Sequence, residues 1–313
     1  MPTVLLINAH SKRGQEMFEA AQQVLKKVGF HDLEPHAVQS LEESEAVLRA
    51  AIARGDEMVV VGGGDGTLSS SAHVRAGTET ALGVLPLGTG NTFARGLELP
   101  LDLEGAAKVL AKGEFARVDV GRVNGRIFIN SVSLGASEQI ASRLDKSLKK
   151  KFGLMAWPVA ALRALGGRRP MRLELRTEFL KMNIKTRQLL IANNSNIASF
   201  VTAPGATLQD GRLETLILGN ESLWSLVKAS WNLLRKRSSK TDIHSVFGPA
   251  IEIHSLSKAR PANVDGDILT YTPLKVDILP RALRVVVPLG SSLLTEGKML
   301  EFALERERAE AEG

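Results

Sequence analysis

A glycine-rich segment with a single carboxylate follows an apolar run near residue 60. Residues 59–68 read Val-Val-Val-Gly-Gly-Gly-Asp-Gly-Thr-Leu, and a helix is predicted to begin at Leu68. Glycine permits positive φ and removes the Cβ, so successive backbone N–H groups can close around phosphate oxygens at a helix N-terminus. A turn without a ligand is the weaker alternative, because so many glycines destabilise a turn. The predicted phosphate-binding loop comprises Gly62, Gly63, Gly64, Asp65, Gly66 and Thr67.

Asp65 is poorly suited to packing among these glycines. Its carboxylate is well suited to hold Mg²⁺ or to orient a nucleotide phosphate, and the hydroxyl of Thr67 adds a hydrogen-bonding group. The segment therefore predicts a nucleotide site rather than a plain turn.

Two further polar loops follow predicted strands in the same manner. Their polar residues are Thr89, Asn91 and Arg95 in the loop at 85–95, and Asn8, Ser11 and Lys12 in the loop at 7–14. Amides and hydroxyls can bind a nucleotide and arginine can neutralise phosphate, although a turn with a helix cap explains the first loop equally well. Ligands bind at the carboxyl ends of strands in open α/β sheets, so the two glycine loops are predicted to face one crevice.

Two carboxylates flank a glycine far downstream. Asp265 and Asp267 lie in Asn-Val-Asp-Gly-Asp, residues 263–267, between two predicted strands. Taken alone, a β-turn explains this pattern. Beside a nucleotide site, the same pair offers the carboxylate that a phosphotransferase needs to accept the proton of the attacking hydroxyl.

Several other function classes are excluded by inspection. The chain has no cysteine, which rules out disulfides, thiolate metal sites and a cysteine nucleophile. It contains no G-x-x-x-x-G-K-[ST], H-E-x-x-H, G-x-S-x-G or G-x-G-x-x-G motif, and its six histidines show no ligand spacing. Only 4% of the residues are aromatic, which leaves little for base stacking, so no nucleic-acid partner is expected.

The pattern of elements predicts two domains in this 313-residue chain. Strands without polar alternation at Val4–Ile7, Met58–Val61 and Ala81–Leu85 are separated by helices at about 15–28 and at 41–54, which predicts an α/β domain with a parallel sheet. After Arg117 the pattern becomes that of antiparallel strands with turns, including a hairpin at Asn124–Gly125 and two late strands at 274–279 and 283–287. We expect residues 1–120, joined by a closing helix at 293–313, to form the α/β domain, and residues 121–292 a β-sandwich-like second domain.

Charge is unevenly distributed along the chain. The formal net charge is +6, yet residues 142–187 hold 13 Lys plus Arg against 3 Asp plus Glu. A second stretch, 222–237, places Leu223, Trp231 and neighbouring apolar residues on one helical face that ends in a basic cluster. Taken alone, an ordinary amphipathic helix packed on the second domain is the better interpretation of this stretch. Both stretches favour peripheral contact with an anionic membrane.

The compartment follows from what the sequence lacks. There is no cysteine, no apolar run near the ~18–20 residues needed to span a bilayer, and no secretory leader at the start of the sequence. We therefore expect a cytoplasmic protein, with peripheral contact at the inner face of the membrane. Whether it forms a homodimer stays open.

Four ordered motifs together resemble the diacylglycerol kinase catalytic-domain family, especially its bacterial soluble lipid kinases. They are N-x-x-S-x-x-G at 8–14, G-G-D-G-T at 63–67, P-L-G-T-x-N-x-F-A-R at 86–95 and N-x-D-G-[ED] at 263–267. The resemblance implies that ATP lies between an α/β domain and a β-sandwich-like domain. The implied nucleotide contacts are Asn8, Ala9, His10, Ser11, Lys12, Ser40, Gly63, Gly64, Asp65, Gly66, Thr67, Leu68, Ser69 and Thr89. It further implies Asp267 as general base, with Asp265 orienting the hydroxyl or binding metal.

The resemblance also implies a structural Mg²⁺ in the second domain. Its counterpart here is the Asp210 carboxylate with the backbone carbonyls of Thr207 and Arg212; without the resemblance, an Asp-Gly hairpin turn is the simpler interpretation. Two positions depart from the common pattern. Thr92 stands where an aspartate often follows the motif asparagine, and Asp267 stands where many members have glutamate.

The expected activity is transfer of a phosphoryl group from ATP, with Mg²⁺, to a hydroxyl of a lipid alcohol, diacylglycerol first among them. One alternative is an NAD kinase, which shares the G-G-D-G-T loop. Another is a nucleotide-binding regulatory protein with weakened catalysis, for which Thr92 and Asp267 give slight support.

Overall fold

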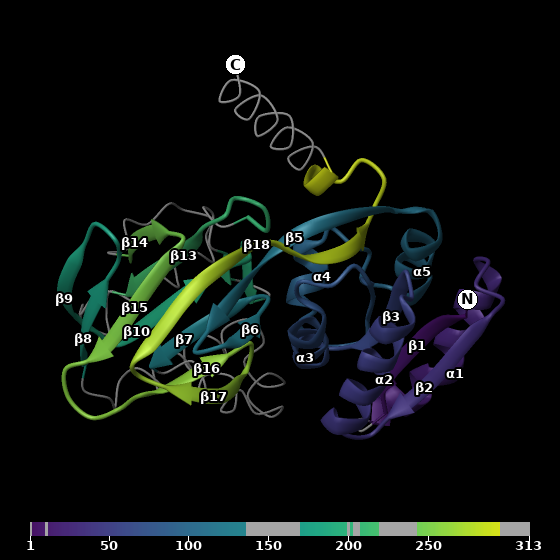
Figure 1. Ribbon diagram of the computed structural model, residues 1–313, viewed down its shortest axis with the longest axis horizontal. Helices are drawn as coiled ribbons and strands as arrows, with labels where there is room; N and C mark the ends of the chain where they lie inside the picture. The colour runs from purple at the N-terminus through teal and green to yellow at the C-terminus, as the bar shows by residue number, and fades with distance from the viewer. Residues whose placement is uncertain are drawn as a thin grey trace, which may run out of the picture. The chain divides into compact units, whose positions relative to one another are not determined.

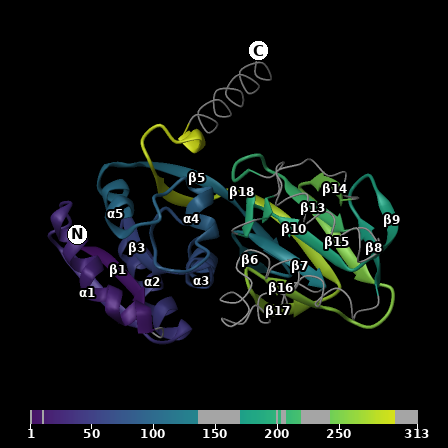
Figure 2. The ribbon, with the colours of Figure 1, turned by 180° about the vertical axis from the view of Figure 1, so that it is seen from behind.

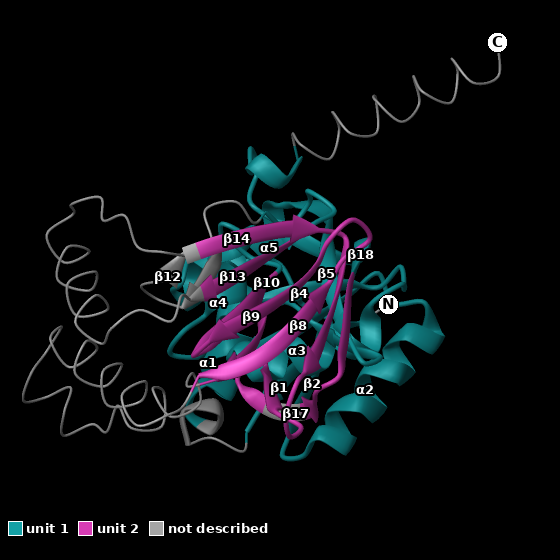
Figure 3. Cartoon of the chain, turned by 90° about the vertical axis from the view of Figure 1, so that its left-hand side faces the viewer, with its two compact units in different colours: residues 1–130, 193–212, 278–313 teal, residues 131–192, 213–277 magenta. Residues whose placement is uncertain are grey.

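The computed structural model describes residues 2–9, 12–135, 170–198, 201–202, 207–218 and 243–294. The chain divides into two compact units, coloured separately in Figure 3. Unit 1 comprises residues 1–130, 193–212 and 278–313, and unit 2 comprises residues 131–192 and 213–277. The strand β18, Leu274–Val287, begins in unit 2 and ends in unit 1. The predicted boundary near residue 120 and the predicted role of the tail remain predictions.

Unit 1 is built on a parallel sheet with the order β2-β1-β3-β4-β18 (Figure 1). Its helices and strands are β1 Thr3–Asn8, α1 Lys12–Lys27, β2 Leu33–Val38, α2 Leu41–Arg54, β3 Met58–Gly63, α3 Asp65–Arg75, β4 Ala81–Pro86, α4 Thr92–Gly96, α5 Leu103–Lys112, β5 Glu114–Val123, β6 Arg126–Phe128, β11 Asn196–Ala198 and β12 Val201–Thr202. The same elements are seen from behind in Figure 2. Turn residues Asn124 and Gly125, both with positive φ, join β5 to β6, as predicted.

Helices cover both faces of the parallel sheet, which explains the absence of polar alternation in its strands. Val4 and Leu6 of β1 pack in one apolar cluster with residues of α2, α3 and α4. The alternate residues Leu5 and Ile7 pack in a second cluster with residues of α1 and α5. Successive side chains of a strand point to opposite faces, so a strand covered on both faces must be apolar throughout. The predicted α/β fold of the first half is confirmed.

Unit 2 consists of antiparallel strands, which confirms the predicted β-rich second domain. One sheet has the order β14-β13-β10-β7-β16-β17, and the first residues of β18 pair with β15, followed by β8 and β9. The strands are β7 Ser131–Gly135, β8 Met171–Arg176, β9 Lys181–Thr186, β10 Gln188–Ala192, β13 Leu213–Leu218, β14 Ile243–Gly248, β15 Ala250–Ser255, β16 Pro261–Val264 and β17 Asp267–Tyr271.

The strand β18 corrects one expectation. The sequence predicts two strands, at 274–279 and 283–287, separated by Pro280, whereas the structure has one continuous strand of 14 residues. Arg281 adopts a left-handed conformation with φ 51°, and its N–H donates to Oδ1 of Asp119 at 2.7 Å. The carboxylate of Asp119, distant in sequence, therefore accepts the backbone N–H of Arg281 directly after Pro280, where the strand pattern is interrupted.

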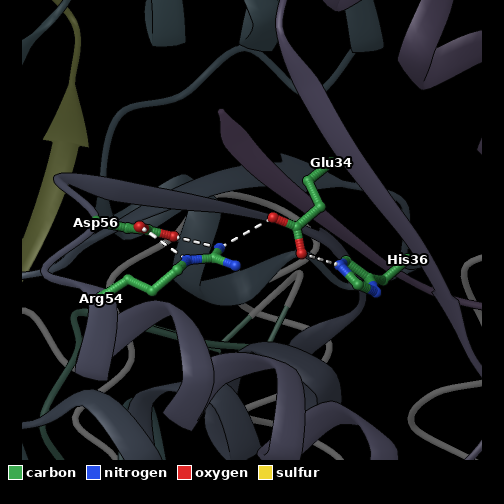
Figure 4. Close-up of polar contacts among 4 residues, drawn as sticks. All are labelled: Glu34, His36, Arg54 and Asp56. Atoms are coloured by element: carbon green, nitrogen blue, oxygen red, sulfur yellow. Dashed lines mark hydrogen bonds and ion pairs between the residues drawn. The ribbon is translucent and has the colours of Figure 1, made fainter. Parts of the chain in front are cut away.

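The edge strand β2 is absent from the predicted elements. Its sequence, Leu-Glu-Pro-His-Ala-Val, contains a proline and polar residues, and polar interactions attach it to its neighbours (Figure 4). Glu34 accepts from His36 Nε2 at 2.8 Å and from Arg54 Nη2 at 3.0 Å. The Arg54 guanidinium also reaches the buried Asp56 at 2.7 Å, which links β2 to the end of α2 and the start of β3.

Acid should weaken this cluster. The bond from His36 and then that from Arg54 hold the pKa of Glu34 below its ordinary value of 4.5. A carboxyl whose pKa is lowered in the folded state stabilises it above the unfolded pKa, and that contribution is lost as pH falls through the folded value. We expect Glu34→Gln to lower the free energy of unfolding by up to ~1 kcal/mol at pH 7, because solvent screens this exposed pair. Urea titrations should show the difference from wild type shrinking as pH falls below the ordinary pKa of 4.5; a difference that stays constant on acidification would contradict it.

Arg75, at the end of α3, is fully buried. Its guanidinium donates to the carbonyl oxygens of Val59 at 3.5 Å, Thr80 at 3.2 Å and Ala81. Burial lowers the pKa of Arg75 to about 9, so the side chain remains charged at neutral pH.

Replacing Arg75 by methionine should leave these carbonyl groups without a donor in the core. We expect Arg75→Met to lower the free energy of unfolding by ~3 kcal/mol, measured by urea denaturation. The matched control is Arg49→Met on the exposed face of α2, which should change stability by less than ~0.5 kcal/mol. Equal effects of the two substitutions would show that Arg75 is not a structural anchor.

Some predictions fall on residues outside the described ranges. These are the 222–237 helix with Trp231, most of the basic segment 142–187, and the tail from Thr295. None of the helices that the structure describes has the length and apolar character needed to cross a bilayer.

Candidate functional site

The glycine-rich loop forms the junction between β3 and α3. Gly62 and Gly63 are the last residues of β3, and Gly64, in extended conformation, precedes the first residue of α3, Asp65. The prediction that the helix begins at Leu68 is wrong by three residues, because the Leu68 N–H already donates to the Gly64 carbonyl at 3.1 Å within the first turn. Leu68 itself is buried in the core.

Close approach of neighbouring atoms, rather than positive φ, explains most of these glycines. None of the four glycines in 62–66 has positive φ, so that part of the prediction is wrong. A Cβ on Gly63 would lie 2.6 Å from the Cβ of Thr67, and one on Gly88 would lie 2.5 Å from the Cα of Gly64. Gly66 differs, because a Cβ there would meet nothing within 4 Å. Its place in the first turn of α3 is exposed and open.

The Asp65 carboxylate joins the first glycine loop to the second. Its Oδ1 accepts from the backbone N–H of Phe93, in α4, at 3.0 Å. In the second loop the Asn91 side chain accepts from Gly88 N at 2.9 Å and donates to Gly88 O at 3.0 Å. Asn91 therefore shapes the loop from a left-handed conformation with φ 48°, and Thr89 is exposed at its tip.

The predicted residues after β1 and β2 lie at the same edge of the sheet as the glycine loops. Asn8, the last residue of β1, donates from Nδ2 to Thr67 Oγ1 at 3.1 Å. Ser40 caps α2 by accepting from the N–H of Glu43 at 3.1 Å. Because β2, β1, β3 and β4 are parallel neighbours, their carboxyl ends share one edge. His10, Ser11 and the side chain of Lys12 lie outside the described part of the chain.

Three buried asparagines near this edge were not predicted. Asn130 Nδ2 lies 3.5 Å from Asp65 Oδ1. Asn194 Nδ2 donates to Asn130 Oδ1 at 3.1 Å and to the Thr92 carbonyl at 3.3 Å, and Asn193 donates to the carbonyls of Asp119 and Ile129. The available signal was the pair Asn193 and Asn194 directly after the apolar strand β10. Amides that are buried next to such a strand make specific hydrogen bonds.

The downstream carboxylates lie on a two-residue hairpin in unit 2. Val264 pairs with Asp267 across β16 and β17, and Asp265 and Gly266 form the turn with φ 49° and 116°. Asp265 is anchored, since Ser131 N donates to its Oδ1 at 2.9 Å and its own N–H donates to Ser131 O at 3.0 Å. Asp267 is exposed, and its carboxylate makes no hydrogen bond or ion pair to any residue that the structure describes.

Asp210 lies in a turn that also contacts the Asp119 carboxylate. The N–H groups of Thr207 and Arg212 donate to Asp210 at 3.2 and 2.9 Å, and Gly211 N donates to Asp119 Oδ2 at 2.8 Å. Burial raises the pKa of both carboxyl groups, and the negative charge of Asp210 raises that of Asp119 further. Within the described ranges, no cluster of three or more His, Cys, Asp or Glu residues is suited to hold a metal ion.

Comparisons with known proteins cover both halves of the chain. The family described as "Diacylglycerol kinase catalytic domain" matches residues 2–123, and "YegS C-terminal NAD kinase beta sandwich-like domain" matches residues 130–287. The chain is 30% identical over 307 residues, 94% of its length, to a Pseudomonas aeruginosa protein named "Probable lipid kinase YegS-like", of which it covers 97%. It is 26% identical to a Bacillus subtilis diacylglycerol kinase over 283 residues, 88% of this chain and 93% of that protein.

The fold has solved relatives as well. A crystal structure of a diacylglycerol kinase from Bacillus anthracis superposes with a TM-score of 0.73 at 20% identity, covering 91% of this chain and 96% of that one. The chain therefore belongs to the diacylglycerol kinase catalytic-domain family and is an enzyme of the lipid kinase class.

Proposed function

We propose that the enzyme transfers the γ-phosphoryl group of ATP to a hydroxyl of a lipid alcohol, with diacylglycerol as the acceptor and phosphatidic acid as the product. The observation that carries this proposal is the meeting of polar loops from β1, β3 and β4 at one edge of the parallel sheet. The names of the relatives supply the lipid part of it.

The phosphates of ATP are proposed to bind at the N-terminus of α3. The N–H groups at the start of this helix and its dipole attract anions. Gly66 supports this assignment, because glycine inside a helix costs about 1 kcal/mol relative to alanine and no neighbouring atom requires it here. A phosphate lying against the exposed first turn supplies the missing reason. The hydrogen bond from Asn8 to Thr67 and the capping role of Ser40 hold the adjacent loops in place.

The residues around Asp210 fit a structural Mg²⁺. Asp210 and the neighbouring Asp119 are partly desolvated carboxylates whose like charges disfavour one another, and Mg²⁺ is commonly held by one or two carboxylates with water. Bound there, the cation would neutralise this charge. We propose Asp210, with the backbone of Thr207 and Arg212, as its ligands, and a separate role for Asp65 in organising the nucleotide and its Mg²⁺.

Asp267 is proposed to act as general base. Its exposed carboxylate, which has no partner among the described residues, can take the proton of the acceptor hydroxyl while the hydroxyl oxygen bonds to the γ-phosphorus and the bond to the bridging oxygen of ADP breaks. Asp265 is assigned to positioning, because two hydrogen bonds to Ser131 fix the turn on which Asp267 lies.

The direct test supplies γ-labelled ATP and Mg²⁺ with diacylglycerol, phosphatidylglycerol, sphingosine, ceramide or NAD in parallel. Labelled phosphatidic acid from diacylglycerol is the expected product. A phosphorylated product from another lipid would change the acceptor while keeping the enzyme class. Nucleotide binding without any product would favour a regulatory protein and contradict the proposal.

NAD is included in the panel for a specific reason. The domain matched at residues 130–287 is described as NAD kinase beta sandwich-like, and NAD kinases, the alternative considered from the sequence, share the G-G-D-G-T loop. Labelled NADP as the sole product would replace the lipid kinase assignment by that alternative.

A further inference from the structure

The hairpin of β8 and β9, residues 171–186, lies in unit 2, where β9 is the edge strand of the order β18-β15-β8-β9. The hairpin can be followed in Figure 3. The turn between the strands closes on itself. Thr177 N donates to Leu180 O at 2.8 Å, and Leu180 N donates to the Thr177 hydroxyl at 3.1 Å. These backbone groups are therefore satisfied within the turn, which lowers the cost of moving the tip out of water.

The tip of this hairpin is apolar. Phe179 is 89% exposed and Leu180 is 42% exposed, whereas the inward residues Met171, Leu173 and Leu175 of β8 are buried. Turn positions ordinarily carry Gly, Asn, Asp, Ser or Pro. At this position the described residues leave most of the Phe179 side chain and nearly half of Leu180 uncovered, which points to a surface outside the chain.

The outward face of the hairpin is basic. Arg172 lies opposite Lys185 and Arg176 opposite Lys181, so the four cations share one face. Arg176 and Lys181 both pair with Glu174. Arg172 and Lys185 form no ion pair with any described residue.

The charge of this face is greatest at the hairpin. Four basic side chains stand against Glu174 and Glu178 in residues 171–186. On the adjoining strands, Glu252 is paired with His254 and Lys275. A positive strip with an apolar tip complements an anionic bilayer, where Lys and Arg meet headgroups and Phe and Leu enter the acyl boundary.

We propose that the β8–β9 hairpin is the element with which this enzyme contacts an anionic membrane, with Phe179 and Leu180 entering the bilayer surface and Arg172 and Lys185 binding its headgroups. The proposal rests on the proposed function, because a lipid acceptor must be reached from a bilayer. A nucleic acid is a poorer occupant, since a single aromatic ring offers no stacking platform.

Vesicle co-sedimentation of the full chain without ATP tests the surface itself. Vesicles contain phosphatidylcholine with or without about a third of phosphatidylglycerol. Wild-type protein should bind the anionic vesicles more tightly and lose affinity as salt increases. Phe179→Ser should weaken binding about tenfold, and the double variant Arg172→Glu/Lys185→Glu should abolish the preference for anionic lipid.

The chain offers matched controls for both changes. Phe247→Ser, at another exposed phenylalanine of unit 2, and Lys108→Glu/Lys112→Glu, on α5, should leave vesicle binding unchanged. Equal losses in test and control variants, or wild-type binding that ignores both anionic lipid and salt, would overturn the proposal.

The absence of cysteine permits a direct measure of insertion. A polarity-sensitive fluorophore attached through Phe179→Cys should shift to shorter wavelength and become protected from iodide when anionic vesicles are added. The same label at Phe247→Cys should not respond. A label at 179 that stays accessible to iodide on vesicle-bound protein would exclude the hairpin as the contact.

Activity separates this proposal from the proposed function. Phe179→Ser should phosphorylate short-chain diacylglycerol dispersed in detergent at the wild-type rate and lose about tenfold on diacylglycerol in anionic vesicles. A wild-type protein that phosphorylates no lipid would contradict the proposed function alone, since the vesicle and fluorescence results stand without ATP.

Discussion

Replacing Asp267 by alanine should lower kcat for lipid phosphorylation by about 10²–10⁴-fold, the range that removal of a general base produces. KM for ATP should change little, because the carboxylate is proposed to act on the acceptor hydroxyl. Folding should be unaffected, since Asp267 is exposed and its side chain binds no described residue. The measurement is steady-state kinetics with diacylglycerol, accompanied by thermal unfolding.

Two companion variants sharpen the experiment. Asp32→Ala removes another exposed aspartate and should leave kcat unchanged. Asp267→Glu keeps the carboxylate on a longer side chain and should retain most of the activity that the alanine variant loses. Wild-type turnover by Asp267→Ala would remove this residue from the mechanism.

Substitution of Asp65 is expected to lower activity nearly as much as substitution of Asp267, for two separable reasons. Its charge is proposed to organise the nucleotide, and its Oδ1 also accepts the Phe93 N–H that joins the two glycine loops. Asp65→Asn keeps an oxygen at this position and removes the charge, so it should fold normally while losing about 10²–10³-fold in kcat/KM for ATP.

Asp65→Ala removes both the charge and the acceptor. We expect the same loss of activity together with a decrease of ~1.5–3 kcal/mol in the free energy of unfolding, because a hydrogen bond to a charged group is lost from the junction of two loops. Kinetics and urea denaturation of the two variants separate these effects. If Asp65→Asn retained wild-type kinetics and only Asp65→Ala were impaired, the carboxylate would be a structural bridge and nothing more.

The parallel half of the fold could be predicted because its signals are local. Buried strands such as Val4–Ile7 are apolar on both faces, and α2 occupies the predicted residues 41–54 with Ser40 as its cap. The edge strand β2 could not be predicted in this way, because its sequence contains a proline and polar residues and it forms by pairing with β1, about thirty residues away in sequence.

Some residues of the candidate site could not be predicted for a similar reason. The positions of the two glycine loops after β3 and β4 could be predicted, and their role in phosphate binding stays a prediction. The reason for Gly88 is the Cα of Gly64, a contact between two loops that no local pattern reveals. Asn130 and Asn194 were not predicted because asparagine after a strand is typical of a turn, and only their buried hydrogen bonds distinguish them. The motif pair Asp265 and Asp267 was identified, whereas the division between an anchored and a free carboxylate required the register of the hairpin.

The composition of unit 1 from three stretches of chain has a consequence for synthesis. Its largest apolar cluster includes Leu208, Leu283, Val285 and Val287 beside residues of β1, β3 and β4, and Asp119 receives hydrogen bonds from Gly211 and Arg281. A nascent chain that has emerged only to residue 130 therefore lacks β18, the strand that completes the sheet of unit 1. Contacts this distant in sequence slow folding and leave partly formed sheets exposed. Residues 1–130 leave the ribosome first, yet their sheet is completed only after β18 has been synthesised.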